Sequence, residues 1–299
     1  MSETSQSPID IVIDKVRRTY GGWRRSTSAE QMRADWDTLF GSDASGAAGE
    51  AVNAAGLSLT WVQAPGVGRE RLFVYLHGGG YKVGSARSHF DLVARISAAS
   101  GAAGLILDYT RAPEAQFPAQ IGELETLCAW LAEQGHAVDR VAFAGDSAGG
   151  NLALAGVLRL REKGLPLPAA LVLLSPWTDL TASGESYETR ADADPIHQRF
   201  MIQNMAGNYL GDADPAQPLA SPLHADLAGF PPMLIQVGDR ETVLDDARNL
   251  AAKAQGAGVP VQLEVWDGMI HVFQQFPDEL AEARQAIDHI GAFLRAHLA

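Results

Sequence analysis

The sequence has few cysteines, few basic side chains and no long apolar run, and each shortage excludes a class of protein. Its 299 residues include one cysteine, Cys128, so an intrachain disulfide is excluded, and no Cys/His cluster has the spacing of a zinc site. The 23 lysines and arginines are outnumbered by 36 acidic residues, which gives a formal net charge of −13. Such a charge repels phosphate backbones and anionic lipid headgroups. We therefore expect no nucleic-acid partner, no membrane partner and no metal.

The sequence also shows neither a predicted targeting segment nor a membrane-spanning segment, which limits the compartments in which we expect the protein. No apolar run approaches the roughly 20 residues that cross a bilayer. The first ten residues, MSETSQSPID, contain neither a basic leader nor an apolar stretch, so no signal peptide is predicted. We therefore expect a cytoplasmic protein. The 46% apolar and 20% charged residues are typical of a globular chain, and the length suits one large domain with an added element.

From about residue 50 onward, short apolar runs alternate with helix-length segments. The expected strands are 57–61, 72–76, 104–107, 141–144, 171–174, 233–237 and 261–266. The expected helices are 89–100, 118–134, 148–162, 244–256 and 278–298. Continuous apolar strands that alternate with helices predict an α/β fold in which a mostly parallel sheet is covered by helices on both faces.

Two segments fall outside this alternation. Residues 1–48 are polar with apolar side chains at helical spacing, which predicts two short helices, and the small residues of 41–49 indicate a linker. Residues 179–220 are rich in aspartate and proline and contain one helical stretch near 198–210. A long segment without a strand, inside a regular alternation, predicts an inserted subdomain.

The sharpest motif is GDSAGG at 145–150, which contains G-x-S-x-G between an expected strand and an expected helix. A serine on such a tight turn needs small neighbours and presents its hydroxyl above the edge of the sheet. The helix N-terminus beneath it favours developing negative charge. Ser147 is therefore the predicted nucleophile. The alternative is a glycine- and serine-rich turn that only caps a helix.

A second motif, HGGG at 77–80, directly follows the expected strand 72–76. Glycines let an oxygen approach backbone N–H donors closely, as a tetrahedral oxyanion requires. The motif resembles the oxyanion loop of lipases and esterases. Gly79 and Gly80, with Ala148 after the nucleophile, would supply the donors, and His77 would brace the loop. The alternatives are a flexible glycine turn or a phosphate loop, although the sequence contains no phosphate-loop signature.

With these motifs the chain resembles the bacterial hormone-sensitive-lipase-like carboxylesterases, which have the α/β-hydrolase fold. The likeness covers roughly residues 50–299 and includes DYTRAPE at 108–114 and SPWTDL at 175–180. Thr110-Arg111 replaces the more usual Arg-Leu, a change that we expect to affect packing rather than chemistry.

The resemblance also implies an architecture. It predicts a mostly parallel eight-stranded sheet with helices on both faces and a helical cap. N-terminal cap helices would occupy residues 1–48, the hydrolase core 49–178 and 221–299, and a cap insertion 179–220.

In this fold the catalytic groups follow the chain order nucleophile, acid, histidine, which excludes the histidines before Ser147 as the base. His271 follows the expected strand 261–266, at the carboxyl edge of the sheet where α/β folds place their sites, and is the predicted general base. The alternative is a loop histidine in a structural hydrogen bond. The other histidines after Ser147 lie in or beside the insertion or in the last helix: His197, His224, His289 and His297.

The acid is sought in GDRETVLD at 238–245, which follows the strand 233–237. The family pattern here resembles Gly-x-x-Asp-x-Leu-x-Asp, which places Glu241 at the acid position. Glutamate in place of aspartate retains a carboxylate that can orient an imidazole. Asp239 is the alternative acid, Asp245 is expected to brace the loop or cap a helix, and Asp146 is expected to support the turn around the nucleophile.

The resemblance implies a serine carboxylesterase that hydrolyses short-chain acyl esters through a Ser-His-Glu triad and an acyl-enzyme, without metal or organic cofactor. The alternatives are a lactone or amide hydrolase with the same machinery, and a non-catalytic ligand-binding receptor on this fold, like the plant gibberellin receptor. The family also implies a homodimer paired along the last strand, 261–266. Candidate pocket residues are Tyr81, Trp177, Phe200, Met201, Ile202 and Phe273.

Overall fold

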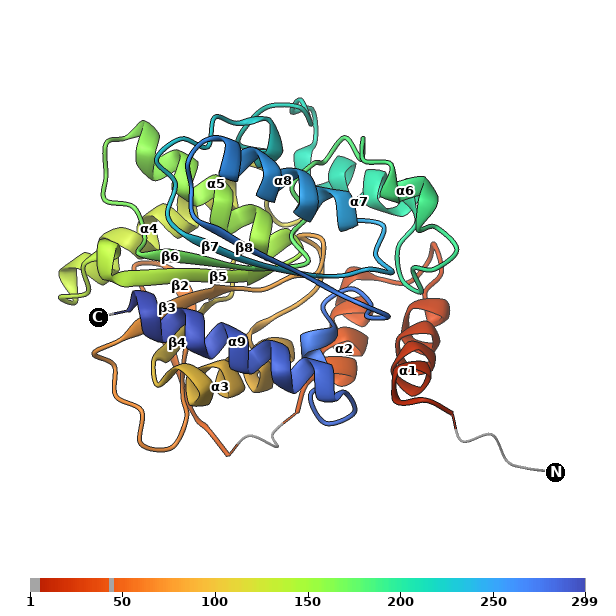
Figure 1. Cartoon of the computed structure of the whole chain (residues 1–299), viewed down its shortest axis with the longest axis horizontal. Coiled ribbons are helices and arrows are strands. Elements are labelled where there is room, and N and C mark those ends of the chain that lie inside the picture. The colour runs from red at the N-terminus through yellow and green to blue at the C-terminus, as the bar shows by residue number, and fades with distance from the viewer. Residues whose placement is uncertain (1–5, 43–45, 299) are drawn as a thin grey trace.

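The computed structural model describes residues 6–42 and 46–298, and their strands form one sheet in the order β1-β2-β4-β3-β5-β6-β7-β8 (Figure 1). The strands are β1 (Ala48–Ala54), β2 (Leu57–Gln63), β3 (Leu72–Leu76), β4 (Ala103–Leu107), β5 (Val141–Asp146), β6 (Ala170–Leu174), β7 (Met233–Gly238) and β8 (Val261–Trp266). β2 pairs antiparallel with both β1 and β4, and every other pairing is parallel. The predicted mostly parallel eight-stranded sheet is confirmed.

Strand β1 corrects only the end of the expected linker over 41–49, because the strand already begins at Ala48. Its first residues belong to a hairpin with β2, and residues 43–45 of the expected linker lie outside the described residues, as do 1–5 of the N-terminal segment. Ala55 and Gly56 close the hairpin with φ of 53° and 78°, as a two-residue turn with positive φ at both positions requires. The segment did not look like a strand because its side chains are mostly exposed and show no apolar alternation.

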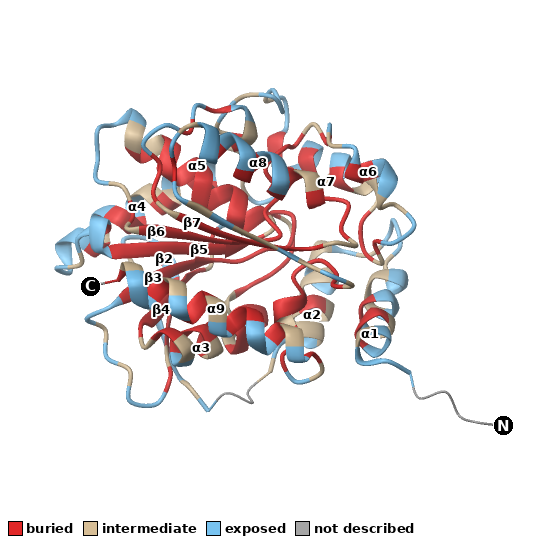
Figure 2. Ribbon diagram, viewed as in Figure 1, coloured by how far each residue is buried: buried red, intermediate tan, exposed pale blue. Residues whose placement is uncertain are grey.

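Helices cover both faces of the sheet (Figures 1 and 2). They are α1 (Pro8–Gly22), α2 (Ala29–Phe40), α3 (Ala86–Ser100), α4 (Ala119–Glu133), α5 (Ala148–Glu162), α6 (Ser186–Thr189), α7 (Arg199–Leu210), α8 (Leu244–Gly256) and α9 (Ala281–His297). Short 3₁₀ turns lie at η1 (Val138–Arg140), η2 (Pro222–His224) and η3 (Phe273–Gln275). The five helices expected in the core and the three expected outside it are all present.

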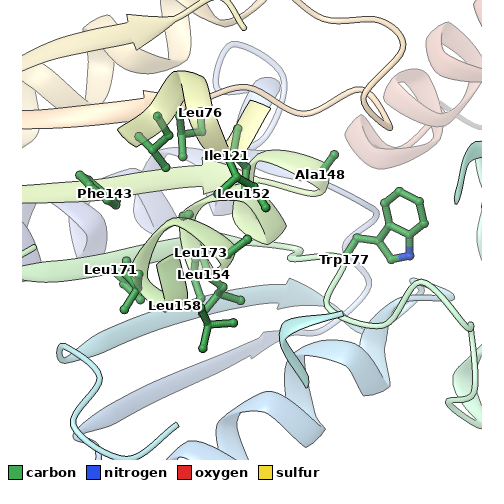
Figure 3. Close-up of a cluster of buried hydrophobic side chains, with 14 of the residues drawn as sticks. Leu76, Ile121, Phe143, Ala148, Leu152, Leu154, Leu158, Leu171, Leu173 and Trp177 are labelled. Carbon is green, nitrogen blue, oxygen red and sulfur yellow. The ribbon is translucent and has the colours of Figure 1, made fainter. Parts of the chain in front are cut away.

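Alternate side chains of each buried strand enter different halves of the core. On β3, Phe73 and Tyr75 pack in the cluster beneath α3 and α9, whereas Val74 and Leu76 pack in the larger cluster beneath α4, α5 and α8. Figure 3 shows part of the larger cluster, where leucines of α5 meet Phe143, Leu171 and Leu173 of the strands. Burial on both faces explains why these strands are continuous apolar runs.

A third cluster joins the N-terminal helices and the segment 179–220, which we call the insertion, to the rest of the structure. Val12 and Val16 of α1 are fully buried against Ile196 of the insertion and Phe273 of the core. Ser7 starts α1 by accepting a hydrogen bond from the Asp10 backbone N–H, and Pro8 occupies the first turn. The apolar face of α1 thus holds it at the carboxyl ends of the strands (Figure 1).

Within residues 6–42 and 46–298, no helix has the length and apolar character that a membrane span requires.

Candidate active site

Ser147 lies on the sharp turn between β5 and α5, with φ of 52° and ψ of −118°. This backbone conformation is rare for a residue other than glycine and costs on the order of 1–3 kcal/mol. A backbone hydrogen bond of 2.9 Å from the Ser147 N–H to the Leu174 carbonyl holds it. The Ser147 side chain makes no capping hydrogen bond to α5, so the interpretation as a simple helix cap is not supported.

The neighbouring glycines are required by close packing of backbone. A Cβ atom on Gly149 would lie 1.9 Å from the Leu76 carbonyl oxygen, and one on Gly145 would lie 2.6 Å from the backbone of Gly149. Helix α5 therefore approaches β3 closely enough to bring Ser147 beside the loop that follows β3.

Gly149→Ala is expected to lower the free energy of unfolding by at least about 3 kcal/mol, because backbone atoms on both sides must move. The matched control is Gly122→Ala at an exposed position of α4, where a Cβ would meet nothing within 4 Å. That change should raise the free energy of unfolding by about 0.5–1 kcal/mol. Urea unfolding of both variants measures the difference, and equal effects would contradict the packing argument.

His271 and Glu241 form a buried pair. The His271 Nδ1 lies 2.7 Å from the Glu241 Oε2, His271 is 7% exposed and Glu241 is fully buried. The other Glu241 oxygen, Oε1, accepts hydrogen bonds from the Ser175 hydroxyl at 2.8 Å and from the Gly238 backbone N–H. Ser175 Oγ also accepts from the Val272 N–H at 3.1 Å, so one serine fastens both the acid and the histidine loop.

The other two carboxylates of this loop have different partners. Asp239 Oδ1 accepts a 2.7 Å hydrogen bond from the Gly268 N–H. Asp245 Oδ2 accepts one of 2.8 Å from the Ser186 N–H, which ties the insertion to α8 as the expected brace. The geometry therefore brings Glu241, and not Asp239, to His271.

The charge state of His271 depends on Glu241. Burial lowers the pKa of His271, but the charge and hydrogen bond of Glu241, together with the charges of Asp194 and Asp146, outweigh burial, so that the pKa is raised above the usual 6.5. The pair thus favours the protonated imidazole more than a free histidine would.

The HGGG loop after β3 is held from several sides. Gly79 and Gly80 have φ of 110° and 60°, and the Gly79 carbonyl accepts hydrogen bonds of 3.0 Å from the N–H groups of Lys82 and Val83. His77 braces the loop through Nδ1, 2.8 Å from the Gly78 carbonyl, while its Nε2 lies 3.4 Å from Asp108 without forming a hydrogen bond to it. These contacts do not fit a flexible glycine turn.

Asp146 connects this loop to the turn around Ser147. Its Oδ1 accepts hydrogen bonds of 2.9 Å from the Gly78 N–H and from the Tyr75 hydroxyl, while His89 Nε2 lies 3.2 Å away. Burial raises the pKa of Asp146, but His89 and the hydrogen bonds outweigh it and leave the pKa lowered. Asp146 supports the turn, as expected from the sequence.

The nucleophile turn, the HGGG loop and the histidine loop border one cavity of about 240 Å³. Ser147, His271 and Gly79 line it together with side chains from the N-terminal helices and the insertion. The contributing residues outside the core are Tyr20, Trp23, Met32, Trp36, Phe40, Ile196, His197, Met201, Asn204, Met205 and Asn208.

Comparison with known proteins identifies the family of the chain. A family model described as alpha/beta hydrolase fold matches residues 73–275. An acetyl-hydrolase of Streptomyces hygroscopicus is 45% identical over 247 residues, which are 83% of this chain and 82% of that protein. A crystal structure of an esterase from the bacterial hormone-sensitive lipase family superimposes with a TM-score of 0.94 at 42% identity, covering 100% of both chains. The chain belongs to the bacterial hormone-sensitive-lipase-like carboxylesterase family.

A second structural relative of this carboxylesterase is EstE5, in crystals described as soaked by p-nitrophenyl butyrate. It is 40% identical with a TM-score of 0.91, and the match covers 98% of this chain and 99% of EstE5.

The pocket of the carboxylesterase corrects part of the sequence prediction. Met201 lines the cavity, but the other pocket candidates do not. Tyr81, Trp177, Ile202 and Phe273 are buried in the packing around the cavity, and Tyr81 stacks on Tyr209 with ring centroids 3.6 Å apart. Phe200 is 63% exposed. It precedes Met201 on α7, and one step along a helix turns a side chain by about 100°.

Sequence reasoning also missed contributors to the carboxylesterase site. Ser175 lies within the SPWTDL motif, but only the fold shows that it reaches Glu241. Four N-terminal side chains in the cavity looked like ordinary apolar faces of helices: Tyr20, Met32, Trp36 and Phe40. Among the described residues, no group of three or more histidine, cysteine, aspartate or glutamate side chains could hold a metal ion.

Proposed function

We propose that this carboxylic ester hydrolase cleaves short-chain acyl esters with Ser147 as nucleophile, His271 as general base and Glu241 as the acid of the triad. The observation that carries the proposal is the 2.7 Å contact of His271 with Glu241, on a histidine that shares its cavity with Ser147. A nucleophile, a base and a group that orients the base are the parts that acyl transfer needs.

In the proposed reaction, His271 removes the proton from Ser147 as its oxygen attacks the ester carbonyl. Backbone N–H groups of Gly79, Gly80 and Ala148 stabilise the oxyanion. The Ala148 N–H begins α5, where the helix leaves it without an intrahelical acceptor. His271 then protonates the leaving alcohol, and a water molecule activated by the same imidazole releases the acid. Glu241 stabilises the imidazolium in both steps.

We also propose that residues 1–48 and 179–220 act as a split cap over the core. The cavity supports this division, because most of its wall comes from α1, α2 and the insertion. Such a cap limits the length of the acyl chain that fits.

The chain-length preference can be measured with p-nitrophenyl esters from acetate to dodecanoate. We expect the highest kcat/KM for acetate to butyrate, and a loss of at least about tenfold for dodecanoate, because a long chain must find room among the side chains of the N-terminal helices and the insertion that line the cavity. Two named relatives agree with short acyl groups, one an acetyl-hydrolase and one soaked by a butyrate ester. A rate that rises steadily with chain length would contradict the proposal, and lactones and amides belong in the same screen.

The pH profile should report the raised pKa of His271. The imidazole must be neutral to accept a proton from Ser147, so kcat/KM falls as the pH drops through this pKa. We expect the midpoint of the acid limb above 6.5 in the wild type. In Glu241→Gln the midpoint should move to lower pH, because the main influence that raises the pKa is removed. A midpoint that does not move in this variant would contradict the assigned pair.

For assembly, we propose a homodimer that pairs along β8. This strand lies at one edge of the sheet, and Val265 on it is 40% exposed. An uncovered edge strand presents backbone groups that a second copy can pair with.

A further inference from the structure

A second histidine lies beside His271 in the cavity. His197 belongs to the insertion, between α6 and α7, and its ring centroid is 4.6 Å from that of His271 with the two planes at 89°. His197 is 7% exposed and lines the same cavity as Ser147. The proposed mechanism assigns no role to His197.

Hydrogen bonds connect the backbone of His197 to the acid loop, the segment 238–245 that contains Glu241. Asp194 Oδ1 accepts hydrogen bonds from the backbone N–H groups of Ile196 at 2.9 Å and His197 at 3.0 Å. The other oxygen, Asp194 Oδ2, accepts from the N–H of Thr242 at 2.8 Å and from its hydroxyl at 3.0 Å. Because Thr242 follows Glu241, the position of His197 is set relative to the triad.

The imidazole of His197 keeps an unused hydrogen-bonding atom. Within the described part of the chain, Nδ1 is buried and has no hydrogen-bond partner. Leaving such an atom unpaired costs about 1–3 kcal/mol. Nδ1 is enclosed by protein, so a partner in the cavity would meet the other ring nitrogen, Nε2. Among the described residues Nε2 has no hydrogen-bond partner either, and His197 lines the cavity, so the ring can offer this atom to a bound molecule.

The place of His197 indicates which part of the substrate it meets. His271 must reach the oxygen of the leaving alcohol to protonate it, so the alcohol portion lies on the His271 side of the cavity. Building on the proposed function, we propose that His197 is a specificity-determining residue that hydrogen-bonds to a hydroxyl group on the alcohol portion of the ester. The preferred substrates are then short acyl esters of polyhydroxy alcohols rather than of plain alkyl alcohols.

The charges around His197 favour a neutral hydroxyl over an ion. Burial and the neighbouring His271 lower the pKa of His197 to about 3, against a smaller opposing effect of Asp194. A neutral imidazole has one donor and one acceptor, which match a hydroxyl. A cationic group would face the imidazolium that forms on His271, and an anionic group would face Glu241 and Asp194.

The test compares 2-hydroxyethyl acetate with propyl acetate, which share the acyl group and differ by a hydroxyl in place of a methyl. The measured quantity is the ratio of their kcat/KM values. Dividing the wild-type ratio by that of His197→Phe removes the intrinsic difference in reactivity of the two esters. We expect the wild-type ratio to be about tenfold larger, the effect of one hydrogen bond. An unchanged ratio, with both esters still hydrolysed, would overturn the proposal.

Further variants keep the result interpretable. His197→Gln retains hydrogen-bonding groups and should restore part of the preference, whereas Met201→Leu, an apolar change in the same wall, should alter both rates by the same factor. If His197→Phe no longer hydrolyses propyl acetate, His197→Leu provides the same comparison. Failure of the wild type to hydrolyse either ester would contradict the proposed function itself, and not the role of His197 alone.

Discussion

Ser147→Ala is expected to lower kcat for p-nitrophenyl acetate by at least ~10⁴-fold, because it removes the hydroxyl that we propose forms the acyl-enzyme. Activity above that of water should survive, since the backbone donors of the HGGG loop remain. Alanine retains the Cβ atom at φ of 52°, and the lost hydroxyl does not cap α5, so the fold should not change.

Two measurements support the interpretation of that variant. Thermal unfolding should give a melting temperature within about 2 °C of the wild type. The loss of one hydroxyl that does not cap α5 should change the free energy of unfolding by less than about 0.5 kcal/mol. A fluorophosphonate should label the wild type covalently and leave Ser147→Ala unlabelled. Labelling that persists, or equal turnover in the two proteins, would place the nucleophile elsewhere. A binding-only protein of this fold would not label at all.

Glu241→Gln is expected to reduce kcat by ~10³–10⁴-fold. The carboxylate accepts the hydrogen of His271 Nδ1, whereas an amide that keeps its oxygen toward Ser175 and Gly238 turns its NH₂ group to the imidazole. That contact favours the tautomer with the hydrogen on Nε2, which cannot accept a proton from Ser147. Steady-state kinetics of the purified variant measures the loss.

Asp239→Asn is the matched control, because it removes one carboxylate from the same loop. Its Oδ1 accepts a hydrogen bond from the Gly268 N–H, which an asparagine oxygen can also accept. We expect kcat within about threefold of the wild type, a difference below ~1 kcal/mol. A larger loss in Asp239→Asn than in Glu241→Gln would show that the assigned carboxylate is wrong.

The parts of the fold that sequence reasoning predicted are those in which local pattern and burial agree. The central strands are apolar on both faces because helices cover both, so they stand out as continuous runs. Strand β1 was missed because it lies at the edge with exposed side chains. Its pairing with β2 is set by backbone hydrogen bonds and the turn at Ala55 and Gly56, which leave little trace in the apolar pattern.

More of the catalytic centre than of the cavity wall could be predicted from the sequence, for a related reason. Ser147 and the HGGG glycines lie in contiguous motifs, because a tight turn and a close backbone approach constrain neighbouring residues. The wall of the cavity combines single side chains from segments far apart in sequence, such as Trp36 and Met205. Which face of α7 meets the cavity depends on how the helix is rotated, and for that reason Met201 lines the cavity and its neighbour Phe200 does not.

The hydrogen bonds of Asp194 have a consequence for how such enzymes can be recombined. This carboxylate joins the insertion to Thr242, the residue after Glu241. A chimaera that receives the insertion of a relative therefore replaces Asp194 and its neighbours, whereas Thr242, the partner of Asp194, still comes from the original protein. The natural unit of exchange is the insertion together with the acid loop, and a crossover placed between them separates residues that must match.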